Sequence, residues 1–178
     1  MTELINSIYR QIQLWDTKII LEVVSWRTDL RTKFFKMMSV MGDGWWWAIL
    51  GIIVWYFVGF NSDWLKMCLT AFAIELIFYK FIKLYTTRRR PYQRYKIIEN
   101  LVEPIDKFSF PSGHTAAATV AAMVFSYAFS WIIPVAVLVV ILIGFSRIYL
   151  GVHYLSDVII GFLLGQFSFW IGFWIFSV

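Results

Sequence analysis

The 178-residue sequence has two histidines, and these are its residues best suited to proton transfer or nucleophilic attack. His114 ends the tetrapeptide at 111–114, and His153 stands four residues before Asp157. Near neutral pH an imidazole can take up a proton, donate one, or attack an electrophile. We therefore expect the chemistry of the chain around these two positions.

His153 and Asp157 are spaced to face each other on one helical turn. A carboxylate on one imidazole nitrogen fixes the tautomer and leaves the other nitrogen free to attack. Arg147, six residues before His153, adds a planar fork that can bind a phosphate group. An alternative for Asp157 is a helix N-terminal charge beside Ser156, which does not exclude catalysis.

The tetrapeptide at 111–114 is typical of a helix start that binds an anion. Pro111 ends a loop, and Ser112 is a good helix N-cap. Gly113 lets a ligand approach the backbone, and free N–H groups at a helix N-terminus bind phosphate. His114 is then close enough to reach a leaving-group oxygen. An ordinary helix start with an interfacial histidine is the competing interpretation.

Cations gather in the segment 83–91, which precedes both histidines. If the helix through Lys83 continues, Arg90 falls on the same face two turns later. Two convergent cations suit a phosphate, although Lys and Arg are also common at the ends of membrane spans. Arg88 and Arg89 fit that second role, as contacts to lipid headgroups.

Carboxylates and thiols are too scattered to predict a metal centre. Asp157 is the only acid after Asp106, and the single cysteine, Cys68, lies in an apolar run. A two-metal phosphatase would need several carboxylates or histidines. We therefore expect no metal and no cofactor, so that the charge on a reacting phosphoryl group is balanced by Lys83, Arg90 and Arg147.

The composition indicates a membrane protein, because 60% of the residues are hydrophobic and 15% charged, with a mean hydropathy of +0.69. Soluble domains are roughly 45–50% apolar and about 25% charged. The net charge of +5 is not gathered in a basic tail or soluble basic domain, so we expect no nucleic-acid partner. Anionic lipid is the more natural partner.

Apolar segments of about the length of a membrane-crossing helix predict an all-α, polytopic membrane helix bundle. We expect one domain over 1–178 with five clear spans, at about Trp45–Phe60, Trp64–Tyr85, Ser112–Ile133, Pro134–Leu150 and Asp157–Val178. Gly161 and Gly165 predict close helix packing in the last span. Short connections at 61–63 and 130–134 predict antiparallel neighbours.

Two regions lie outside this regular pattern. In residues 1–43, apolar residues recur at helical spacing, which fits either an amphipathic helix in the interface or a sixth span; periodicity does not decide between them. The connection 86–111 is long, polar and basic, and so is more typical of an active-site loop than of an idle linker. With this topology all three polar blocks reach one membrane face.

Taken together, the three blocks resemble the type 2 phosphatidic acid phosphatase superfamily. Its pattern is K-x6-RP, then PSGH, then SR-x5-H-x3-D. The chain matches every position, at Lys83, Arg90 and Pro91, at Pro111 to His114, and at Ser146, Arg147, His153 and Asp157. The match covers residues 83–157. Each block alone is weak evidence for the family.

The resemblance implies metal-independent hydrolysis of a lipid phosphate monoester or pyrophosphate through a phosphohistidine. It implies His153 as nucleophile, Asp157 as its partner and His114 as the acid. The phosphoryl oxygens would be held by Lys83, Arg90, Ser112, Gly113 and Arg147. A lipid-to-lipid phosphotransferase and a non-catalytic lipid-phosphate binding protein are the alternatives.

The resemblance also implies a bacterial inner-membrane enzyme with its active site facing the periplasm. Family substrates include undecaprenyl pyrophosphate, phosphatidylglycerol phosphate, phosphatidic acid and the 1-phosphate of lipid A. The positive-inside rule points the other way, because nearly all Lys and Arg except Lys66 lie on the expected active-site face. Neither the headgroup nor the oligomeric state follows from the sequence.

Overall fold

The computed structural model describes residues 2–58 and 63–176, and this part of the chain is helical without strands. The predicted all-α class is therefore confirmed. In chain order the elements are α1 (Thr2–Ser25), α2 (Asp29–Met41), α3 (Gly44–Val58), α4 (Asp63–Thr86), α5 (Pro91–Arg94), α6 (Gly113–Ala128), the 3-10 helix η1 (Ser130–Ile132), α7 (Ile133–Tyr149) and α8 (Leu155–Phe176).

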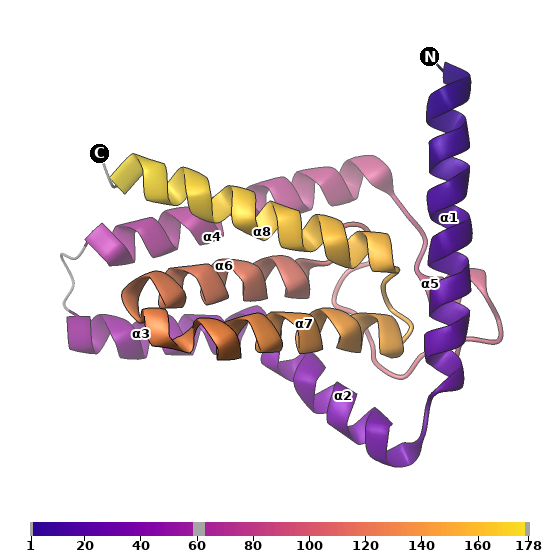
Figure 1. Cartoon of the computed structure of the whole chain (residues 1–178), viewed down its shortest axis with the longest axis horizontal. Coiled ribbons are helices and arrows are strands. Elements are labelled where there is room, and N and C mark those ends of the chain that lie inside the picture. Colours follow the sequence, from indigo (N-terminus) through magenta and orange to yellow (C-terminus); the bar gives the residue numbers. More distant parts are fainter. Residues whose placement is uncertain (1, 59–62, 177–178) are drawn as a thin grey trace.

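Five long helices run side by side and coincide with the five expected spans (Figure 1). They are α3, α4, α6, α7 and α8, and their ends lie within a few residues of the expected ones wherever the structure describes them. The exception is α6, which ends at Ala128, so that η1 forms part of the expected third span. Residues 59–60 of the first expected span, residues 177–178 of the last, and residues 61–62 of the short connection lie outside the described residues.

The count of five membrane spans is not confirmed by helix length and composition. Ser130–Tyr149 and Leu155–Phe176 are long and apolar enough to cross a membrane, and α2 with α3 forms a third candidate if this pair, bent by 54°, is one span. The 15 residues of α3 and 16 of α6 extend only about 22–24 Å, short of the roughly 30 Å of hydrocarbon. The longer α4 carries charged residues along its length.

Helix α6 lies at the centre of the bundle and contacts α3, α4, α7 and α8. Its buried positions are mostly small, which lets neighbouring backbones come close. A side chain at Gly161 of α8 would lie 2.5 Å from the Ser112 carbonyl oxygen, and one at Gly165 would lie 2.6 Å from that of Ala116. The close packing predicted for these two glycines is confirmed, and it sets α8 against the start of α6.

Helix α1 crosses one end of the bundle instead of running along it (Figure 1). Ile20 and Val23 are buried against a cluster that includes Ile148 and Leu150 at the end of α7. The outer side of α1 exposes apolar residues, among them Ile8 and Trp15, so the predicted apolar stripe is only partly buried. This position favours the interfacial alternative for the N-terminal region over a sixth span packed along the bundle.

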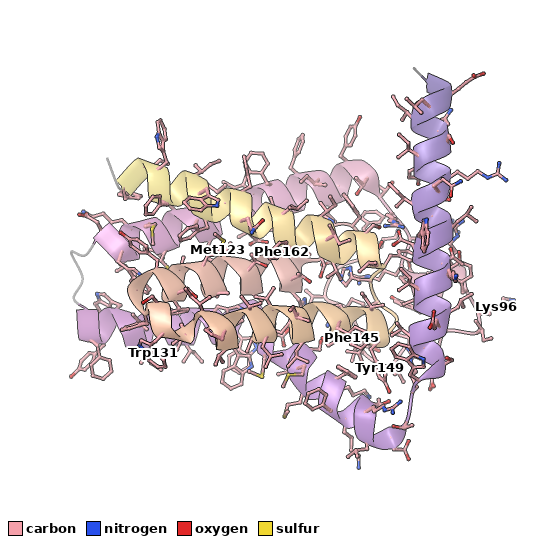
Figure 2. All side chains as sticks on the ribbon, in the orientation of Figure 1. Lys96, Met123, Trp131, Phe145, Tyr149 and Phe162 are labelled. Atoms are coloured by element: carbon pink, nitrogen blue, oxygen red, sulfur yellow. The ribbon has the colours of Figure 1, made fainter. Side chains whose placement is uncertain are left out.

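The aromatic residues labelled on α7 and η1 mark the two ends of the bundle (Figure 2). Tyr149 lies at the end next to α1 and is buried, where its hydroxyl accepts a hydrogen bond from the Thr28 N–H at 3.1 Å. Trp131 lies at the opposite end and is largely exposed. An exposed Trp at a helix end is typical of a membrane interface.

Arg88 joins α1 to the bundle, which corrects the prediction that it contacts lipid headgroups. Its guanidinium donates to Asp16 of α1 at 2.7 Å and to Asp157 of α8 at 2.5 Å, and it stacks on the Tyr154 ring. Both carboxylates are buried, so they need a cation that the sequence pattern did not assign to them. Arg89 is exposed, and its predicted role stays a prediction.

We expect Arg88→Met to lower the free energy of unfolding by roughly 3–5 kcal/mol, because it leaves two buried carboxylates without their cation. Chemical denaturation in detergent micelles would measure it, with Arg89→Met as the matched control at the neighbouring exposed position. Equal stability of the two variants would contradict the anchoring role of Arg88.

Candidate active site

The three polar blocks meet at the end of the bundle next to α1, as the topology predicted. The Arg90 guanidinium lies 3.3 Å from His153 Nε2, which joins the first block to the third. The Ser112 N–H donates to the Asp157 carbonyl oxygen at 2.9 Å, which joins the second block to the third. Residues up to 74 positions apart in the sequence thus form one site.

A cavity of about 370 Å³ lies between the α2–α3 junction, α4, the loop 95–112 and the start of α6. Five predicted site residues line it: Arg90, Gly113, His114, Arg147 and His153. Lys83, Ser112 and Asp157 lie behind this lining. The cavity therefore brings both histidines and two of the three predicted cations together.

Lys83 and Arg90 converge, but not along a continuous helix. Helix α4 ends at Thr86, and Thr87 adopts a left-handed conformation with φ of 45°, so the predicted helical continuation is wrong. The two cations instead meet at Asp106 Oδ1, at 2.7 Å from Lys83 Nζ and 2.5 Å from Arg90 Nη2. The chain turns back at Thr87 and brings Arg90 to the same place by another path.

Asp106 occupies the position where these cations would bind an anion. It also accepts a hydrogen bond from the Tyr79 hydroxyl. Burial raises the pKa of Asp106, but the hydrogen bonds from Lys83 and Tyr79 outweigh it and hold the pKa at about 2. The carboxylate is therefore ionised at neutral pH, and a phosphate group would compete with it for the two cations.

His153 turns one nitrogen to Asp157 and the other toward Arg90. Its Nδ1 lies 3.6 Å from Asp157 Oδ2, close enough for a charge interaction but too long for a hydrogen bond. The predicted facing of the two side chains is confirmed, although they do not share a helical turn: His153 precedes α8, which begins at Leu155. Asp157 Oδ2 accepts instead from the Tyr154 N–H at 2.8 Å.

Burial lowers the pKa of His153 well below its usual range, and the positive charges of Arg90 and Arg147 lower it further. The imidazole is therefore neutral at pH 7, and a neutral imidazole has the lone pair that nucleophilic attack requires.

His114 has a carboxylate partner that the sequence did not predict. Its Nε2 lies 2.8 Å from Asp43 Oδ1, in the short junction between α2 and α3. Asp43 is 71 residues away from His114 in the sequence, so the spacing of the motif residues gave no sign of this pair. Both histidines of the chain thus face an acid: Asp157 for His153 and Asp43 for His114.

Ser112 and Gly113 differ from their expected roles in detail. Ser112 is the N-cap of α6, but its hydroxyl lies 2.9 Å from Thr115 Oγ1 and its N–H is bound to Asp157. A side chain at Gly113 would lie 2.6 Å from the Tyr79 ring, so the glycine makes room for Tyr79. Gly113 lines the cavity, whereas Ser112 is fully buried behind it.

Arg147 reaches the cavity from the last turn of α7. Its side chain is buried and donates a hydrogen bond to Ser39 of α2. Within the described part of the chain, the Nε groups of Arg147 and Arg90 have no hydrogen-bond partner. Buried donors without partners are uncommon, and they leave both arginines with hydrogen-bonding capacity for an anion.

A family model described as the PAP2 superfamily matches residues 64–178, well over half of the chain. The chain belongs to the PAP2 superfamily. The resemblance drawn from the motifs is thereby confirmed, and the match covers every predicted site residue. It leaves out α1 to α3, including Asp43.

Two solved structures share the arrangement of the helices. LpxE of Aquifex aeolicus superposes with a TM-score of 0.78 at 29% identity, over 88% of this chain and 93% of that one. A transmembrane PAP2-type phosphatidylglycerolphosphate phosphatase of Bacillus subtilis superposes with a TM-score of 0.77 at 26% identity, over 91% of this chain and 84% of that one.

Sequence relatives with curated names include phosphatidylglycerophosphatase B of Bacillus subtilis, 31% identical over 59% of this chain and 54% of that protein. A decaprenylphosphoryl-5-phosphoribose phosphatase of Mycobacterium tuberculosis is 37% identical over 59% of this chain and 56% of that protein. The chain spans about half the length of the curated relatives it matches.

The sequence motifs did not predict three side chains of this site: Asp43, Tyr79 and Asp106. Asp43 stands between two glycines just before an apolar segment, and this position is the sequence feature that could have indicated a role for it. Tyr79 precedes Lys83 by one helical turn, and Lys83 Nζ donates to its hydroxyl at 2.7 Å. Asp106 is one of three acids in the loop 86–111, with Glu99 and Glu103, and its spacing does not single it out. None of the three belongs to the family motif.

We expect His153 to remain neutral at pH 6.5, the usual histidine midpoint, because burial and the nearby arginines oppose its protonation. With two histidines in the chain, NMR of ¹⁵N-histidine-labelled protein gives two ring systems, and His114→Asn assigns them. Acid below pH 6.5 should also destabilise the fold, because only the unfolded state then binds this proton. A His153 midpoint at or above 6.5 would contradict the burial argument.

Proposed function

We propose that this chain hydrolyses a phosphate monoester or pyrophosphate on a membrane lipid through a phosphohistidine intermediate. The observation that carries the proposal is the cavity with two histidines, each beside its own carboxylate, and the buried Arg90 and Arg147. Nucleophile, acid and charge stabilisation are the parts that phosphoryl transfer needs. Family membership supports the same reaction class.

In the first step His153 Nε2 attacks phosphorus, and the bond from phosphorus to the lipid oxygen breaks. His114 gives its proton to that oxygen, so the lipid leaves as an alcohol or, from a pyrophosphate, as a lipid monophosphate. Asp157 stabilises the positive charge that develops on the His153 ring. In the second step water attacks the phosphohistidine, His114 takes a proton from it, and inorganic phosphate leaves.

Phosphate binding requires an exchange of anions. Lys83 and Arg90 are neutralised by Asp106 in the structure, and the phosphoryl oxygens would replace that carboxylate. Arg147 adds a third cation and the Gly113 N–H a backbone donor, while Ser112 orders the start of α6 from behind. The positive charge of these residues supplies the electrostatic stabilisation in a reaction that uses no metal or cofactor.

In the membrane we place α3, α4, α6, α7 and α8 as five crossing helices, with bilayer thinning at the short ones. Helix α1 then lies in the interface, with its exposed apolar side toward lipid. The substrate is a phosphorylated lipid whose tails stay in the bilayer. The names of two relatives, phosphatidylglycerophosphatase B and decaprenylphosphoryl-5-phosphoribose phosphatase, support a lipid phosphate as substrate. We propose the bacterial inner membrane, with the site on the periplasmic face.

A lipid phosphotransferase would use the same intermediate and pass the phosphoryl group to a second lipid. Water would be replaced by a lipid hydroxyl in the second step. An assay with a single phosphorylated lipid in detergent separates the two, because release of inorganic phosphate without an acceptor lipid requires hydrolysis.

We expect the purified protein to release phosphate from at least one of phosphatidylglycerol phosphate, phosphatidic acid, undecaprenyl pyrophosphate and lipid A 1-phosphate. His153→Asn should lower the rate by about a thousandfold or more, because it removes the nucleophile. Acid-labile ³²P label should form on the wild type and not on the variant, and equal melting temperatures would show that both are folded. Undiminished release by folded His153→Asn would overturn the mechanism.

We expect Asp43→Asn to lower kcat at least about tenfold, because the amide no longer supports a charged His114. KM should stay within about twofold, since Asp43 does not bind the phosphate. Asp29→Asn, at an exposed position of α2, is the matched control and should keep full activity. A change confined to KM would mean that Asp43 contacts substrate instead of orienting His114.

A further inference from the structure

Glu75 is a buried acid that the proposed reaction does not use. It lies on α4, is 5% exposed, and lines the cavity beside Tyr79 and His114. Within residues 2–58 and 63–176, no group forms a hydrogen bond or an ion pair with its carboxylate. A carboxylate that lines a cavity can accept a hydrogen bond from a ligand, and ionisable residues inside a membrane protein are usually functional.

The position of Glu75 along α4 relates it to a particular part of the substrate. Glu75, Tyr79 and Lys83 follow each other at intervals of four residues, so they share one face of the helix. The backbone position of Glu75 lies two turns before that of Lys83, about 12 Å along the axis, but the Lys83 ammonium reaches back to the Tyr79 hydroxyl at 2.7 Å and so comes closer to Glu75. Phe72, a further turn along, lines the cavity with an apolar side chain.

A lipid phosphate likewise has a phosphate at one end, apolar tails at the other and a linker between them. Its phosphate would lie at Lys83 and Arg90, its tails would leave toward the bilayer, and the linker between them would pass Glu75. We propose that Glu75 determines substrate specificity by accepting a hydrogen bond from a hydroxyl or amine group in this linker. The inference rests on the proposed function and narrows its substrate class to lipid phosphates that carry such a donor.

Kinetics with matched lipids test the contact directly. The substrates are phosphatidylglycerol phosphate, its analogue lacking the linker hydroxyl, and phosphatidic acid, which has no donor in its linker. The wild type should show a kcat/KM about tenfold higher for the first than for the other two. Glu75→Leu removes every side-chain acceptor, whereas Gln would keep one, so Glu75→Leu should reduce this ratio to about two or less, mainly by slowing the hydroxyl-bearing lipid.

The four combinations of enzyme and hydroxyl form a cycle that measures coupling between the two groups. If Glu75 binds the hydroxyl, removing both costs no more than removing either one. Asp63→Asn removes a charge from the exposed end of the same helix and should leave the ratio unchanged. Melting temperatures in detergent establish that each variant is folded, and the wild-type ratio tests the inference even if Glu75→Leu does not fold.

Failure of the proposed function and failure of the inference about Glu75 give different results. Absence of phosphate release from every lipid by the wild type would overturn the proposed function. Release with equal kcat/KM for the hydroxyl-bearing lipid and its analogue, or faster release from phosphatidic acid, would overturn the role of Glu75 alone. So would losses that add in the cycle, or a Glu75→Leu variant that slows all three lipids equally, because a purely structural residue would do the same.

Discussion

The candidate site depends on one buried ion pair, between Arg88 and Asp157. Asp157 is fully buried, and such a carboxylate is stable only with a cation and hydrogen bonds around it. Arg88 supplies the cation at 2.5 Å, and the Tyr154 N–H supplies a hydrogen bond at 2.8 Å. Because Arg88 also holds Asp16, the same pair fixes α1, the segment after α4 and the start of α8. His153 lies within this frame, so its orientation follows from it.

The cations of the site need a balancing negative charge, just as Asp157 needs a positive one. Lys83, Arg90 and Arg147 are all buried, and like charges close together in a medium of low dielectric repel strongly. Asp106 balances two of them through contacts of 2.5–2.7 Å. It comes from the long connection 86–111, so the loop predicted to belong to the active site contributes the balancing charge. In the proposed reaction a phosphate would replace the Asp106 carboxylate at these cations, one anion for another, so the net buried charge would not become more positive.

The sequence predicted the helices and the meeting of the motifs well, because both depend on local patterns. Long apolar segments require helices in a membrane, and antiparallel order places 83–91, 111–114 and 146–157 at one end. Partners distant in sequence were missed. Asp43 reaches His114 across 71 positions, and Arg88 turned inward to two acids while its neighbour Arg89 stayed exposed. Nothing in a run of three arginines tells which of them finds a buried carboxylate.

Helix α4 carries both charged and apolar residues of the site, in an order that matches the parts of a lipid phosphate. Along a single face of α4, Lys83 and Tyr79 contact Asp106, Glu75 follows at mid-helix, and Phe72 continues into apolar surroundings. Both acids are on or beside the cavity, but they are stabilised differently: Asp106 by two cations and a tyrosine, Glu75 by no partner within the described residues. The proposed phosphate-binding end is therefore charge-balanced in the structure. At mid-helix, Glu75 presents a carboxylate that lines the cavity, and in the proposed complex a donor on the substrate would bind there.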